Sequence, residues 1–157
     1  MLVSMRWNLH RVGAAVLGLA LCTSAAAQDR GYWRAASKNA STITGDFALG
    51  DTRLTLNFYS FPVAPIRRLS TTEVAAAFDV DLNSGANGQL YRLRIAAGQQ
   101  FMHKNTLCGS DDTQWMATFV EGRNLHVAFF SGDSQPVLTM QAILDSTDLC
   151  GIFVYAR

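Results

Sequence analysis

The sequence contains little charge, little proline and little cysteine. Of its 157 residues, 16% are charged, 3 are proline and 3 are cysteine, and 13 Lys and Arg side chains nearly balance 12 Asp and Glu. Nucleic-acid-binding domains carry a clustered basic surplus, so a net charge of +1 argues against nucleic acid as a partner. Internal repeats, low-complexity tracts and long linkers are also missing. These absences leave a single globular domain.

The one long apolar run lies at the amino terminus. Basic residues precede the run VGAAVLGLALC, and three consecutive alanines precede Gln28. This order is typical of a secretory signal peptide, and the run is too short to span a bilayer comfortably. The sequence therefore predicts a signal peptide at residues 1–27 and one domain of about 130 residues at 28–157. We expect the mature protein to be secreted or periplasmic, without a transmembrane segment.

Two of the three cysteines lie in the predicted mature domain. Cys108 and Cys150 form an even pair in an oxidising compartment, which predicts one disulfide. Metal binding is the alternative, but neither cysteine has another Cys or His at ligand spacing, so no metal site is expected. Cys22 lies within the predicted signal peptide. Lipid attachment at Cys22 would require a small residue before it, and Leu21 stands there instead.

Residues 105–133 are predicted to form the centre of the fold. Two apolar runs are joined by EGRN, and a turn at Gly122 and Arg123 pairs residues whose numbers sum to 245. Both faces of this hairpin are apolar, which favours a core on one side and either covering chain or a ligand groove on the other. One face pairs Met116, Thr118 and Val120 with Phe129, Val127 and Leu125, and the other pairs Trp115, Ala117 and Phe119 with Phe130, Ala128 and His126.

The preceding segments predict a second hairpin and a less regular crossing. Residues 42–58 alternate about a two-residue turn at Gly50 and Asp51, which predicts an outer hairpin with one face in water. Pro62 and Pro65 each remove a ladder donor. The segment that contains them is therefore expected to be at most an edge strand or an extended crossing.

Helix and strand signals complete the predicted fold. Ser70 and Glu73 fit a capping box at the start of a short helix, and Thr139 can cap a second one. Residues 149–156 are apolar on both faces, which favours an interior strand. Together these patterns predict a mainly β domain, either a small antiparallel β-barrel or a sandwich, with one or two short helices and one disulfide. We favour the barrel.

Three segments resemble those of a known group of proteins. The segment NTLCGSDDTQWMA, with YWRAAS near the start of the mature chain and STDLCG near its end, is similar to a group of uncharacterised small secreted bacterial proteins. The resemblance covers most of the mature chain and implies secretion and the cystine pair. It brings no known activity and therefore no functional residues.

The residue types of a hydrolase are present without a motif that frames them. Ser110, His126 and Asp112 could supply a nucleophile, a base and an orienting carboxylate, but no strand-turn-helix serine motif surrounds them. A calcium loop is suggested by Asp79, Asp81 and Asn83, which alternate as oxygen ligands do. The EF-hand glycine and glutamate are missing, so a plain turn is the favoured interpretation, and no cofactor is expected.

A binding role has the strongest candidate residues. Trp115, Phe119 and Phe130 share one face of the central hairpin, and they form a core unless that face is open. An open face edged by His126 and by the turn at Asp111 and Asp112 would suit a small amphipathic ligand or an unknown partner protein.

Three classes of function follow from these observations. The favoured class is a non-enzymatic binding module, of which inhibitors of cell-wall lytic enzymes are one instance by analogy of fold. The second class is a small secreted hydrolase. The third is a structural, envelope-associated protein.

Overall fold

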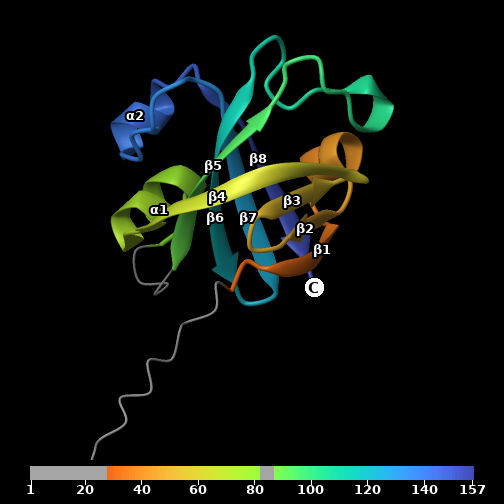
Figure 1. Ribbon diagram of the computed structural model, residues 1–157. Helices are drawn as coiled ribbons and strands as arrows, with labels where there is room; N and C mark the ends of the chain where they lie inside the picture. The colour runs from red at the N-terminus through yellow and green to blue at the C-terminus, as the bar shows by residue number, and fades with distance from the viewer. Residues whose placement is uncertain (1–27, 82–86) are drawn as a thin grey trace, which may run out of the picture.

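The computed structural model describes residues 28–81 and 87–157, which form a closed antiparallel β-barrel of eight strands (Figure 1). Each strand pairs with the next in the chain, and β8 returns to pair with β1. The prediction of a mainly β domain is confirmed, and of the two architectures considered it is the favoured barrel that forms. The predicted signal peptide lies outside the described residues. The strands are β1 (Gly31–Ala35), β2 (Phe47–Leu49), β3 (Arg53–Leu56), β4 (Tyr59–Leu69), β5 (Gly88–Ile95), β6 (Thr113–Glu121), β7 (Asn124–Phe130) and β8 (Leu149–Ala156).

Short helical segments within the described ranges connect or cover the strands. They are the π-helical turn η1 (Ala40–Thr44), α1 (Thr71–Phe78), the 3-10 turn η3 (Met102–Lys104) and α2 (Met140–Leu144). The two α-helices lie on the same side of the barrel (Figure 1). The predicted helix starts are confirmed, because Ser70 and Glu73 form the full capping box of α1 and the Thr139 side chain accepts from the Ala142 N–H of α2.

The central hairpin is β6–β7, and its predicted register is confirmed from Trp115 opposite Phe130 to Glu121 opposite Asn124. Both of its faces are buried, because they belong to two different cores. Met116 and Phe129 point into the barrel interior. The opposite face packs beneath the helices, with Trp115, Ala117, Phe119, Ala128 and Phe130 against Leu69, Val74, Ala77, Phe78 and Leu138. Covering chain, not an open groove, therefore occupies the second side.

Helix α1 packs unusually close to the sheet at Gly88. A Cβ at this position would lie 2.7 Å from a Val74 methyl carbon and 2.9 Å from the Thr118 carbonyl oxygen. Only glycine allows both contacts, since it lacks a Cβ. The first residue of β5 thus sets how deeply α1 sits on the barrel.

The predicted register of the outer hairpin is wrong by two residues. Phe47 pairs with Leu56, and the Gly50 N–H donates to the Arg53 carbonyl oxygen, so the turn centres on Asp51 and Thr52 and not on Gly50 and Asp51. Because the error is even, the inward side chains of the paired strands, Phe47, Leu49, Leu54 and Leu56, are as predicted. Phe58, which the alternation also places on the apolar face, is instead 97% exposed. The strand is also shorter than predicted, since η1 occupies residues up to Thr44, and its C-cap Gly45, with φ of 64°, turns the chain before β2 begins.

The prediction that prolines confine residues 59–69 to an edge is also wrong. β4 is the longest strand, but β3 pairs only with its first part, up to Pro62, whereas β5 pairs from Val63 onward. At each point the strand therefore has one partner, and a missing proline N–H can face the unpaired side. The ladder also shifts register just after Pro65.

The predicted disulfide is present between Cys108 and Cys150, with the two Cα atoms 4.9 Å apart. It connects the loop before β6 to β8, which pairs with β7 on one side and β1 on the other. The bond therefore links the loop that precedes the central hairpin to β8, the strand that closes the barrel.

Candidate functional site

The turn between β3 and β4 exposes a phenylalanine in a conformation that favours glycine. Leu56 pairs with Tyr59, so Asn57 and Phe58 form a two-residue turn, and their φ angles are 42° and 71°. Two positive φ angles define a type I′ turn, in which Asn-Gly is the preferred sequence. A left-handed conformation costs an L-residue with a Cβ about 1–2 kcal/mol. Phe58 is also 97% exposed, so its ring gains almost nothing from burial in return.

Two exposed tyrosines extend this surface. Tyr59 is 46% exposed and Tyr32 is 58% exposed; with Phe58 they form what we call the aromatic tip. Tyr32 and Phe58 also border a shallow hollow of about 220 Å³, which reaches the buried Phe47. The aromatic tip thus has an exposed ring, that of Phe58, and a shallow hollow beside it.

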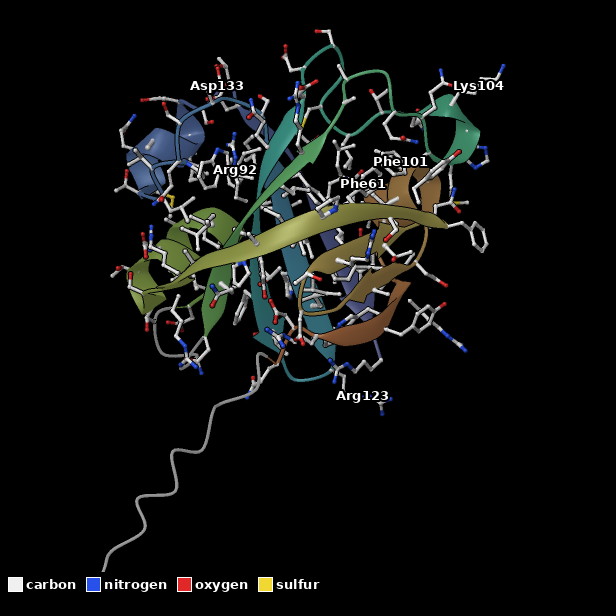
Figure 2. All side chains as sticks on the ribbon, in the orientation of Figure 1. Phe61, Arg92, Phe101, Lys104, Arg123 and Asp133 are labelled. Carbon is white, nitrogen blue, oxygen red and sulfur yellow. A yellow bond between two sulfur atoms is a disulfide. The ribbon has the colours of Figure 1, made fainter. Side chains whose placement is uncertain are left out.

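A buried ring, Phe101, and a partly buried ring, Phe61, support the aromatic tip. Figure 2 shows Phe61 and Phe101 together beside the first residues of β4. The Phe101 ring lies edge-on to Tyr59 at 5.9 Å and to Phe61 at 6.0 Å, a geometry that stabilises aromatic pairs. Tyr59 is therefore held in place although about half of it is exposed.

The charge around the aromatic tip is mainly positive. Arg34 and Arg53 are exposed; Arg53 donates to the Ser60 hydroxyl at 3.3 Å, and Arg34 lies near Tyr32. A nearby carboxylate, Asp46, accepts hydrogen bonds from the Tyr32 hydroxyl and from the Ala35 N–H at 3.0 Å. These bonds hold the pKa of Asp46 below its usual value and raise the pKa of Tyr32. The Asp46 carboxylate is thus hydrogen-bonded to groups of the protein itself.

Backbone strain is concentrated at the same end of the barrel. Five described residues other than glycine have positive φ angles, and four of them lie here, in two turns that meet at Gly45: Asn57, Phe58, His103 and Lys104. Such strain persists where the surrounding structure or the function demands it, and it is common at binding sites.

A second surface lies between α1 and residues 135–140, and we call it the helix groove. It encloses about 690 Å³, within the range of ligand sites. At one end, Arg67 donates two hydrogen bonds to Glu73, at 2.7 and 2.9 Å. This ion pair lowers the Glu73 pKa to about 2. The groove is lined by Arg67, Thr72, Glu73, Ala75, Ala76, Asp79, Val80, Gln135, Pro136, Val137, Leu138, Thr139 and Met140.

The aromatic residues singled out from sequence lie in the second core. Trp115 is 8% exposed, Phe119 2% and Phe130 1%. The Arg92 guanidinium covers the Trp115 ring at 4.5 Å. The structure therefore places these three side chains under α1, α2 and Arg92. In the described part of the chain, the aromatic tip and the helix groove are open instead.

The polar candidates are not brought together. Asp112 accepts from Arg94 Nε at 3.1 Å and from the Ala97 N–H at 3.0 Å, which lowers its pKa, and Ser110 and Asp111 are exposed in the same loop. His126 pairs with Phe119, six positions along β6 from Thr113, or roughly 20 Å away.

The surroundings of His126 are those of a packed side chain. Its ring stacks on Phe119 at 5.5 Å and meets Phe78 at 6.2 Å. Burial holds the His126 pKa below its ordinary value, and Glu121 at 3.5 Å opposes this shift. The hydrolase arrangement of Ser110, His126 and Asp112 thus has no shared location in the fold.

Within residues 28–81 and 87–157, no group of three His, Cys, Asp or Glu side chains is arranged to hold a metal ion. The suggested calcium loop falls partly outside the described residues, at 82–86. None of the described helices has the length and apolar character needed to cross a membrane. In comparisons with known proteins, no family model, no curated protein and no solved structure matches this chain.

Proposed function

We propose that this protein is a secreted or periplasmic, non-enzymatic binding module that holds a partner protein through the aromatic tip. The observation that carries the proposal is Phe58, which is 97% exposed at a turn position where glycine is preferred. A large apolar side chain there adds strain and gains no burial within the domain. Burial in a partner would account for it, because aromatic anchors dominate the energetics of protein interfaces.

The charges around the tip indicate what the partner surface contains. Arg53 donates to the Ser60 hydroxyl, next to Tyr59, and Arg34 lies near Tyr32, so a complementary surface has an apolar pocket bordered by carboxylates. Enzymes that cleave polysaccharides with paired carboxylates offer such a cleft. An inhibitor of a cell-wall lytic enzyme is therefore the instance of this function that we favour.

Two features support export of the domain. The disulfide is of the kind that persists in oxidising compartments. Asp29, just after the predicted cleavage site, is already a buried part of the barrel, at 4% exposure. Cleavage after residue 27 would therefore leave the whole barrel intact.

The proposal predicts that Phe58→Gly removes partner binding without harming the fold. The assay measures cell-wall hydrolysis by a lysozyme with and without the purified domain, and capture of proteins from a bacterial periplasmic extract. We expect inhibition or capture by the wild type to fall at least about 30-fold in Phe58→Gly, the loss typical of a central aromatic anchor.

Val137→Ala is the matched control, because Val137 is an exposed apolar residue, at 66%, outside the aromatic tip. It should bind as the wild type does. Equal binding by Phe58→Gly and wild type, or absence of any specific partner for the wild type in both assays, would contradict the proposed function.

A further inference from the structure

We infer that the helix groove is a second, separate binding site, and that its ligand is a single-chain amphiphile with a cationic head group. The groove and the aromatic tip lie at opposite ends of β4, which begins at Tyr59 beside the tip and ends at Leu69 just before α1. Eleven strand residues span roughly 33 Å. A ligand in the groove therefore does not depend on the partner of the tip, and the inference does not depend on the proposed function.

The walls of the groove suit a hydrocarbon chain. On the α1 side, the groove is lined by Ala75 and Ala76, whose small side chains are 8% and 7% exposed. On the opposite side, Val137 is 66% exposed and Met140 is 50% exposed, although both are apolar. Apolar side chains that face each other across an open groove gain free energy when a chain displaces the water between them.

The existing ion pair disfavours an anionic head group. Arg67 is the one basic residue among the described residues that line the groove, and its guanidinium already donates to Glu73, to the Arg68 carbonyl oxygen at 3.1 Å and, with the Gln135 amide turned, to the Gln135 oxygen. A carboxylate or phosphate on the ligand would have to displace Glu73 from this bidentate pair.

The carboxyl end of α1 favours a cationic head group. The last turn of α1 contains no basic residue, and its C-cap is Asp79, an exposed lining residue of the groove. A helix carboxyl end carries a partial negative charge, so an aspartate there is unfavourably placed and a cation is attracted. An ammonium head at this end of the groove meets both the Asp79 carboxylate and the helix dipole.

The inference is tested by calorimetric titration of the purified domain, below micellar concentrations, with dodecyltrimethylammonium and with dodecanoate. These probes have comparable chains and opposite charges. We expect the cation to bind at least tenfold more tightly than the anion. Asp79→Asn should weaken cation binding about fivefold while leaving the fold intact, because asparagine tolerates the left-handed conformation of this residue, with φ of 53°.

A second variant and a control distinguish binding in the helix groove from binding elsewhere on the domain. Val137→Ser removes part of the exposed apolar wall and should weaken binding of both probes, whereas Phe58→Gly should bind them as the wild type does. Equal affinity for the two probes, or cation binding that neither Asp79→Asn nor Val137→Ser reduces, would overturn the inference. Loss of probe binding in Phe58→Gly would show that the probe sits on the aromatic tip instead and would also overturn it.

Discussion

Removing the disulfide with the paired substitution Cys108→Ala and Cys150→Ala is expected to lower the free energy of unfolding by about 4 kcal/mol. The two cysteines are 42 positions apart, and a cross-link over such a loop restricts the unfolded chain by about that amount on the chain-entropy estimate. The total free energy of unfolding of a small domain is roughly 5–15 kcal/mol. The variant should therefore be close to its limit of stability at ambient temperature.

Urea unfolding of the oxidised wild type, the reduced wild type and the paired variant measures this effect. Ser110→Ala is the control, since Ser110 is an exposed residue in the same loop and its substitution should change stability by less than about 0.5 kcal/mol. The paired variant and the reduced wild type should agree. A loss below about 1 kcal/mol in both would show that the link between this loop and β8 does not constrain the barrel.

Asp29→Ala is expected to cost about 3 kcal/mol, because this carboxylate joins the first residues of the domain to two interior strands. Asp29 is 4% exposed, and its Oδ2 atom accepts from the Tyr91 hydroxyl at 2.7 Å and the Thr118 hydroxyl at 2.6 Å. The backbone carbonyl oxygen of Asp29 also accepts a hydrogen bond from Trp33 Nε1 at 2.9 Å. Truncation leaves the buried Tyr91 hydroxyl without an acceptor, and it leaves Thr118 with only its bond to the Gln89 carbonyl oxygen at 3.4 Å. An orphaned buried group costs about 1–3 kcal/mol.

The same urea measurement tests Asp29 with Tyr91→Phe as the partner variant. Burial and the Asp29 carboxylate raise the pKa of Tyr91, which keeps its hydroxyl protonated as a donor at all ordinary pH. Removing the hydroxyl together with Asp29 should cost less than the two single losses added, because the same hydrogen bond is removed twice. Strict additivity, or a loss below about 1 kcal/mol for Asp29→Ala, would contradict the anchoring role.

The parts of the fold that follow from local pattern could be predicted from sequence. The register of β6–β7 is fixed by the EGRN turn and by two apolar faces, and both are visible in the chain. The capping box of α1 is equally local. The register of the outer hairpin could not be predicted, because a turn at Gly50 and Asp51 and a turn at Asp51 and Thr52 place the same strand side chains inward.

The effect of the two prolines in β4 depended on tertiary structure. Whether a missing N–H is tolerated depends on which neighbour lies beside each residue, and here β3 and β5 pair with successive parts of the strand. Closure of the barrel produces this offset. No local pattern in the segment indicates it.

Neither of the two open surfaces was predicted from the sequence. Asn57 is a residue typical of turns, but the Phe58 that follows it is typical of strands. The sequence therefore gave no clear sign of a turn at these two residues. The helix groove depends on how α1 and residues 135–140 meet, and these segments are far apart in the chain. Trp115, Phe119 and Phe130 were prominent in the sequence because they form a core.

The most direct test of the central claim is the free energy of unfolding of Phe58→Gly relative to the wild type. If Phe58 serves a partner and not the fold, the glycine variant should be as stable as the wild type or up to about 1 kcal/mol more stable, because the left-handed strain is relieved and no buried area is lost. A loss of more than about 1 kcal/mol would show that the exposed ring stabilises the barrel itself, and would contradict a surface retained for binding.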